Sequence, residues 1–163
     1  MVDSQHPLWD KYKRALETFP STQSCLLPNA KRQDGWDLAA VNWAGFRDQR
    51  DIEVCLFRIA DSLGPPERMK DWFIGQGFKE IHGPQQVIAT GRDSKETETW
   101  FSLEAFLDIA VFEERVHFES SVFRSIPAWL LPKGTPYSRD QEMVLGYSKS
   151  GRIIVIQSTR RGG

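Results

Sequence analysis

The strongest constraint on the fold is the stretch from Asp51 to Phe78, which has the pattern of two helices joined by a sharp turn. Gly64 is suited to close the first helix, and Pro65 cannot continue it. A second apolar stripe follows, and Gly75 and Gly77 end it. The first helix has apolar residues at the spacing of one helical face, namely Ile52, Cys55, Leu56, Ile59, Ala60 and Leu63.

After this helix pair the apolar period changes from about 3.6 residues to 2, which is typical of strands. Short strands are expected over 78–82 and 86–90, with a turn at Gly83 and Pro84 between them. Further strands are expected at 98–103, 106–112, 116–118, 143–148 and 152–157, the last two forming a hairpin around Lys149-Ser150-Gly151.

The helical period is confined to the N-terminal half, where a first helix is expected over residues 7–19. This segregation predicts an α+β fold, with N-terminal helices packed on a largely antiparallel C-terminal sheet. We expect a single domain over residues 1–163. Its helical part would cover about 7–77, its sheet part about 78–157, and a flexible tail 158–163.

Cysteine content and hydropathy bear on the compartment. The chain has only two cysteines, Cys25 and Cys55, and its first residues lack the apolar core of a signal peptide. No apolar run approaches the length of about 18 residues that would span a membrane. We therefore expect a cytoplasmic protein with no membrane segment, whose two cysteines are not bonded to each other.

Motifs for bound metals, nucleotides and covalent catalysis are missing from the sequence. We therefore expect no metal and no cofactor. Arg115, His117 and Glu119 alternate on an expected strand and would point to one side of it. Such a trio could hold an acid–base pair, so a hydrolase or transferase that uses these three residues is one alternative, although a solvated strand face is the favoured explanation of the pattern.

A second alternative is a winged-helix-like DNA-binding protein, because the helix pair is followed by two short strands that could form a wing. The second helix and the wing offer four basic residues, Arg68, Lys70, Lys79 and Arg92. Glu67 and Asp71 share that second helix and would face phosphates. Because affinity for nucleic acid depends on neutralising phosphates, this mixed charge disfavours DNA as the partner.

The remaining hypothesis is a small protein-interaction module, such as an adaptor, inhibitor or immunity-type factor that binds another protein stoichiometrically. Residues 92–119 are acidic overall and residues 120–163 are basic, so blocks of opposite charge could orient a partner. Aromatic residues and arginine dominate interface energies. The stretch 36–50 has the least regular packing pattern. Core packing is the favoured explanation of its aromatic residues, and if a partner binds we expect its anchors among Trp36, Trp43, Phe46 and Arg47.

Overall fold

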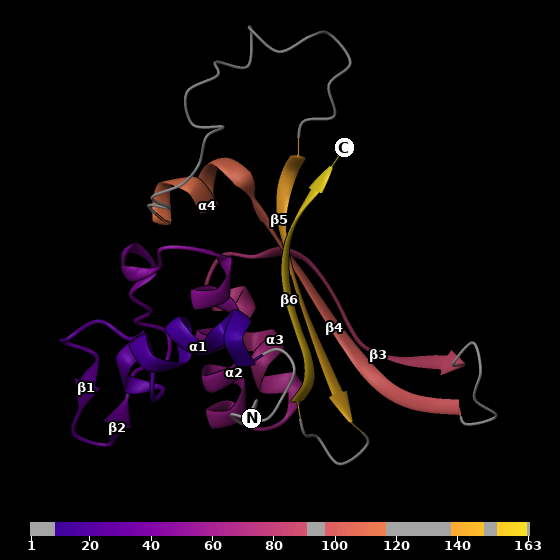
Figure 1. The fold of residues 1–163 in the computed structure, drawn as a ribbon, viewed down its shortest axis with the longest axis horizontal. Coiled ribbons are helices and arrows are strands. Elements are labelled where there is room, and N and C mark those ends of the chain that lie inside the picture. The colour runs from indigo at the N-terminus through magenta and orange to yellow at the C-terminus, as the bar shows by residue number, and fades with distance from the viewer. Residues whose placement is uncertain (1–8, 91–96, 117–137, 149–152, 163) are drawn as a thin grey trace, which may run out of the picture.

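The computed structural model of this chain describes residues 9–90, 97–116, 138–148 and 153–162. It shows an α+β fold with the helices mostly N-terminal and the sheet C-terminal, as the sequence predicted (Figure 1). In chain order the elements are α1 (Trp9–Thr18), η1 (Gln23–Cys25), β1 (Lys31–Arg32), β2 (Gly35–Trp36), η2 (Trp43–Gly45), α2 (Gln49–Leu63), α3 (Pro66–Gly75), β3 (Lys79–Thr90), β4 (Thr97–Asp108), α4 (Ile109–Arg115), β5 (Ser138–Ser148) and β6 (Ile153–Gly162).

The helix pair α2 and α3 confirms the prediction made from the stretch 51–78. Helix α2 begins three residues before its apolar stripe, because the side chain of Asp48 accepts hydrogen bonds from the backbone N–H groups of Arg50 and Asp51. Gly64 ends α2 with a positive φ of 79°, and its N–H donates to the Ala60 carbonyl. Pro66 opens α3, where its missing N–H is not needed.

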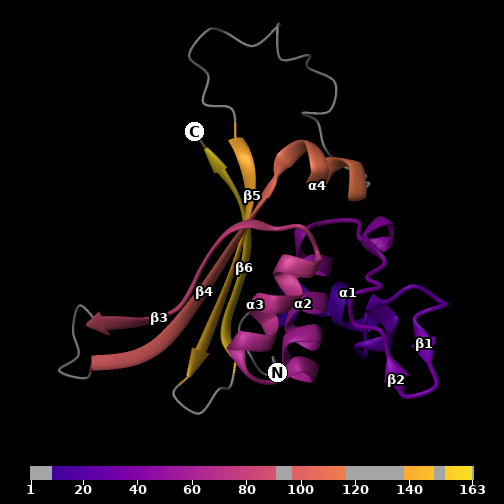
Figure 2. The same ribbon diagram turned by 180° about the vertical axis from the view of Figure 1, so that it is seen from behind.

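Strands β3, β4, β5 and β6 form one antiparallel sheet in that order. The helices lie on one side of this sheet (Figure 2). The core contains side chains from β4 and β5 together with those of α2 and α3. The β4 and β5 members of this core are Leu103, Ala105, Leu107, Met143, Leu145 and Tyr147. Burial of this shared apolar surface holds the two halves of the chain together.

Strand β3 corrects the prediction of two short strands around a turn. It runs unbroken from Lys79 to Thr90, and the register against β4 shifts between Lys79 and Gln85 instead of reversing. Gly83 has a φ of 100°, and a Cβ atom there would lie 2.3 Å from the Ser102 carbonyl oxygen. The glycine therefore allows an irregularity inside a paired strand, which a local sequence pattern does not distinguish from a turn.

Helix α4 corrects the strand predicted over residues 106–112. Strand β4 ends at Asp108, whose carboxylate accepts a hydrogen bond of 2.8 Å from the backbone N–H of Ala110. This cap starts a short helix, and Phe112 on it is buried. Apolar residues at 109–112 suit either element, so the aspartate cap decides between them.

The antiparallel pairing of β5 with β6 confirms the predicted C-terminal hairpin, whose turn residues 149–151 lie outside the described residues. The structure also extends β6 to Gly162, through residues predicted as a flexible tail. Ser158 pairs with Met143, and Gly162 pairs with Ser138. These residues are ordered in β6 because β5 begins earlier than its apolar pattern indicates.

Helix α1 is joined to α2 by polar contacts as well as by packing. The Arg14 guanidinium lies 2.8 Å from a carboxylate oxygen of Asp48 and 2.9 Å from one of the fully buried Asp51. The Tyr12 hydroxyl donates to Glu53 at 2.5 Å. Because a buried carboxylate is costly without a partner, Arg14 fixes how α1 lies on the start of α2.

Tyr147 on β5 supplies a stability prediction. Its side chain is buried, and its hydroxyl has no hydrogen-bond partner among the described residues. Burial, and to a smaller extent the charge of Glu67, raises the pKa of Tyr147 above its usual value. We expect Tyr147→Phe to raise the free energy of unfolding by about 1 kcal/mol, because it removes an unpaired buried hydroxyl and keeps the ring.

Urea unfolding followed by circular dichroism measures this change. Tyr12→Phe is the matched control, because it removes a hydroxyl that does donate a hydrogen bond. We expect the control to lower the free energy of unfolding by about 1 kcal/mol. If both variants were destabilised equally, the Tyr147 hydroxyl would have a partner in solution and the prediction would be wrong.

Candidate functional site

The candidate site is the segment 26–41, called here the Trp36 loop. Its two ends meet in a β-bridge between Leu26 and Val41. Inside it, β1 and β2 pair antiparallel, with Lys31 opposite Trp36. This small hairpin lies on the far side of the helices from the four-stranded sheet (Figures 1 and 2). The Trp36 loop is therefore a folded projection with its own backbone pairing.

Backbone hydrogen bonds run along the whole length of the Trp36 loop. The N–H of Leu27 donates to the Ala40 carbonyl at 2.8 Å, and the N–H of Asp37 donates to the Ala30 carbonyl at 2.9 Å. The N–H of Ala30 donates to the Leu27 carbonyl at 2.9 Å. These bonds satisfy backbone groups inside the loop, so its shape does not depend on a partner.

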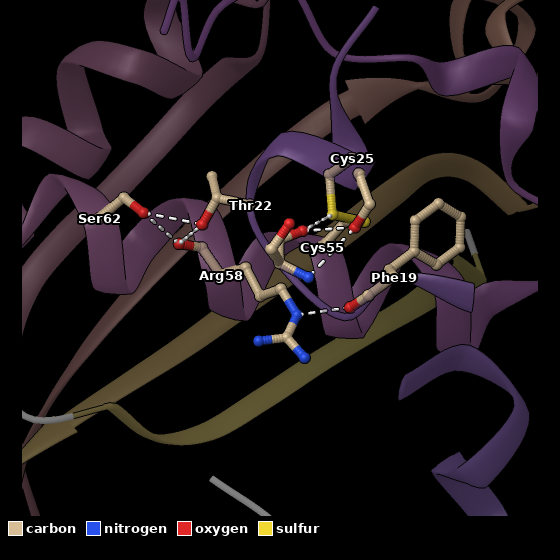
Figure 3. Close-up of a disulfide and its surroundings, with 8 residues drawn as sticks. Phe19, Thr22, Cys25, Cys55, Arg58 and Ser62 are labelled. Carbon is tan, nitrogen blue, oxygen red and sulfur yellow. Dashed lines mark hydrogen bonds between the residues drawn. A yellow bond between two sulfur atoms is a disulfide. The ribbon is translucent and has the colours of Figure 1, made fainter. Parts of the chain in front are cut away.

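A disulfide between Cys25 and Cys55 fastens the base of the Trp36 loop to α2 (Figure 3). The S–S distance is 2.03 Å and the two Cα atoms lie 5.6 Å apart. The prediction that these cysteines are not bonded to each other is wrong. The chain separates them by 30 positions, and only the packing of η1 against α2 brings their Cα atoms within disulfide reach.

Polar contacts surround the disulfide (Figure 3). The Arg58 side chain on α2 donates from Nε to the Phe19 carbonyl oxygen at 2.6 Å. The hydroxyl oxygens of Thr22 and Ser62 lie 2.9 Å apart, and that of Thr22 donates to the Arg58 carbonyl at 3.2 Å. The segment that leads from α1 into the loop is thus bound to α2 at several points.

Helix α3 holds the other end of the Trp36 loop. The indole N–H of Trp72 donates to the Leu38 carbonyl at 2.7 Å, and the side-chain amide of Gln76 donates to the Ala39 carbonyl at 2.9 Å. Trp72 on α3 and Gln76, which directly follows this helix, are both buried. Each bond supplies a loop carbonyl with a hydrogen-bond partner in place of water. The position of this end of the loop is therefore set by α3.

The loop carries apolar surface that the described residues leave uncovered. Trp36 is 40% exposed and Leu27 is 39% exposed. Beside Trp36, the Arg32 guanidinium pairs with the Asp37 carboxylate. This hydrogen bond, together with one from the Ala39 N–H, lowers the pKa of Asp37 below its usual value. The site therefore combines an exposed indole with a neighbouring ion pair, a composition typical of protein-binding surfaces.

The structure separates the four residues predicted as partner-binding anchors. Trp36 and Arg47 are exposed, whereas Trp43 and Phe46 are buried. The Trp43 ring packs edge to face on Phe46, with the ring centroids 5.7 Å apart. The indole N–H of Trp43 donates to the Gln76 side chain at 3.1 Å. The short η2 turn points both rings toward α2 and α3, so these two side chains serve as core. A binding role for Trp36 and Arg47 stays a prediction.

Of the predicted catalytic trio only Arg115 is described, and His117 and Glu119 lie outside the described residues. Arg115 is the last residue of α4, not part of a strand, because the Asp108 cap starts a helix there. Its guanidinium donates to the Gln76 carbonyl at 2.7 Å. A catalytic role for the trio stays a prediction.

His82, which no sequence motif marks, lies on β3 opposite Glu104 of β4. The His82 ring packs edge to face on Phe106, with the ring centroids 5.7 Å apart. The Ser102 hydroxyl donates to the Glu104 carboxylate at 3.3 Å. His82 and Glu104 are far apart in the sequence, and only the register of β3 against β4 brings them side by side. Among the described residues no group of three or more His, Cys, Asp or Glu side chains is arranged to hold a metal ion.

The winged-helix alternative also stays a prediction. Helix α3 presents Glu67, Arg68 and Asp71 as exposed residues, which mixes acids with a base along one helix. Lys79 begins β3, and Arg92 lies outside the described residues. With this mixture of charges, α3 would neutralise fewer phosphates than a basic helix would.

No protein-family model, curated protein or solved structure matches this chain. None of the helices in the described ranges combines the length and the apolar character that crossing a membrane requires.

Proposed function

We propose that this protein acts by stoichiometric binding to another protein, as an adaptor, inhibitor or immunity-type factor, and that the Trp36 loop makes the central contact. The observation that carries the proposal is a tryptophan that is 40% exposed on a loop fixed at both ends. Tryptophan is among the residues most enriched at the energetic centres of interfaces.

The rigidity of the Trp36 loop supports this function. A flexible loop would lose conformational entropy on binding, and that loss would weaken the complex. Here the disulfide at Cys25 and the bonds from Trp72 and Gln76 order the loop before any partner arrives. Leu27 extends the apolar surface offered by Trp36, and the Arg32–Asp37 pair supplies polar groups beside the indole.

The buried disulfide also bears on where the protein acts. The expected cytoplasmic location rested on the low cysteine content and on first residues unlike a signal peptide, and it implied free thiols, but Cys25 and Cys55 are bonded. Disulfides persist in oxidising compartments and are rare in the reducing cytoplasm of most cells. We therefore favour an oxidising compartment for the proposed binding function.

Affinity capture from a native extract tests the proposal, with buffers free of reductant so that the disulfide stays intact. We expect the unaltered protein to recover one partner near one-to-one stoichiometry, and Trp36→Ala to lose it. Removing a central aromatic anchor costs about 2 kcal/mol or more of binding, which is about a thirtyfold weaker affinity.

Ile74→Ala is the control, because Ile74 on α3 is 57% exposed and lies outside the Trp36 loop. It should retain the partner. The melting temperatures of both variants should stay close to that of the unaltered protein, since exposed side chains contribute little to stability. Equal recovery of the partner by Trp36→Ala and by the unaltered protein would refute the proposed site.

A further inference from the structure

The two edges of the four-stranded sheet are treated differently. Strand β6 forms one edge, and α2 covers it. The Ser158 N–H donates to the Glu53 carboxylate at 3.1 Å, and the Ser158 carbonyl accepts from the side-chain amide of Gln49. These two α2 side chains occupy backbone groups that could otherwise pair with another strand.

Strand β3 forms the other edge, and its distal half has no such cover among the described elements. Beyond Val87, β3 and β4 continue as a two-stranded arm that projects past the helices (Figures 1 and 2). Gln85 and Gln86, which lead into this arm, are exposed. An edge strand presents a row of backbone donors and acceptors, and a further strand is the group that fits them.

The irregular features of β3 are confined to its proximal half. Glu80 has a positive φ of 49°, Gly83 has one of 100°, and both register shifts lie between Lys79 and Gln85. From Gln85 to Thr90 the pairing with β4 is one-to-one. Natural sheets protect edges with bulges and charges, and residues 85–90, QQVIAT, have neither.

We propose that residues 85–90 of β3 pair antiparallel with the same residues of a second copy of this chain. The pairing would join two four-stranded sheets into one continuous sheet across a two-fold axis. A two-fold axis closes the assembly at two copies, because each edge is used once. The occupant is a second copy because a segment without charged residues can face itself without repulsion between like charges.

The arrangement of the helices permits this assembly. They lie on one side of the sheet, and the β3–β4 arm extends past them (Figure 2). Two arms can therefore meet edge to edge without contact between the helices. The Trp36 loop lies on the far side of the helices from the sheet, so the dimer leaves it exposed (Figure 1).

Sedimentation equilibrium and light scattering on the full chain test the proposal. We expect the mass to rise from one chain to two over about two decades of concentration. In this pairing Gln86 of one copy faces Ala89 of the other. The double variant Gln86→Lys/Ala89→Lys therefore places lysines directly opposite each other and should raise the dissociation constant at least about tenfold. Gln86→Glu/Ala89→Glu should weaken the dimer in the same way, and a mixture of the two variants should restore it.

Gln157→Lys is the matched control, because Gln157 is exposed on β6, the covered edge. It should leave the dimer unchanged, as should Trp36→Ala, which separates this inference from the proposed function. Unchanged melting temperatures would show that the charged variants still fold. A chain that stays monomeric at every concentration would overturn the proposal, even if an extended peptide from another protein bound β3. A dimer insensitive to the charges would also overturn it.

Discussion

Trp43→Ala is expected to lower the free energy of unfolding by about 3 to 5 kcal/mol, the usual cost of truncating a buried tryptophan. Trp43 is 9% exposed and packs on Phe46 and Trp72, with ring centroids 5.7 and 6.4 Å away. Its loss would also leave the buried side-chain oxygen of Gln76 without the indole donor that it now has. The variant should unfold at much lower urea concentrations.

Two variants show whether this cost arises from burial. Trp36→Ala removes an exposed indole of the same size only seven positions away, and it should change the free energy of unfolding by less than about 0.5 kcal/mol. Trp43→Phe keeps most of the ring contacts but not the N–H donor, so its loss should be intermediate. If Trp43→Ala were as stable as Trp36→Ala, Trp43 would not be part of the core.

Loss of the disulfide is the second large expected effect. Replacing Cys25 and Cys55 by alanine should lower the free energy of unfolding by about 3 to 4 kcal/mol, because the crosslink restricts a loop of this length in the unfolded chain. The separation of 30 positions sets that length. Urea unfolding of the double variant, compared with the oxidised protein, measures the difference.

Reductant supplies the control for the disulfide. It should destabilise the unaltered protein by a similar amount and leave the double alanine variant unchanged. Both sulfur-bearing residues are buried, at 0% and 1% exposure, so reduction should require prior unfolding or long incubation. If the intact mass did not rise by two hydrogen atoms when the protein was unfolded and then reduced, the result would contradict the bond.

The helix pair was predictable because its signals are local. The apolar spacing, Gly64 and the adjacent prolines all act within one or two turns of helix, and α2 and α3 follow them closely. The start of α2 was missed by two residues, because the Asp48 cap lies outside the apolar stripe. Segregation of the helical and strand periods was likewise enough to predict the α+β class.

Strand continuity was not predictable in the same way. Gly83 and Pro84 are turn residues by composition, yet β4 pairs with β3 on both sides of them. The apolar residues 109–112 also fit a strand, but the cap at Asp108 begins a helix there. In both places the local pattern is ambiguous, and the pairing or the cap decides the structure.

The candidate site was predictable only in part, because burial is a property of the folded chain. Trp36 and Trp43 are chemically identical, and no local pattern places one on the surface and the other in the core. The separation depends on Trp72 and Gln76, each more than thirty positions from the residue it binds. These two side chains bind Leu38, Ala39 and Trp43 and so hold one end of the Trp36 loop and Trp43 in place. The pairing of Cys25 with Cys55 depends on the same packing.

Titration calorimetry of the captured partner into this protein tests the central claim most directly. The account predicts a one-to-one complex whose dissociation constant rises at least about thirtyfold in Trp36→Ala and stays unchanged in Ile74→Ala. Both variants should keep the melting temperature of the unaltered protein. An unchanged dissociation constant in a folded Trp36→Ala variant would contradict the role of the Trp36 loop in binding.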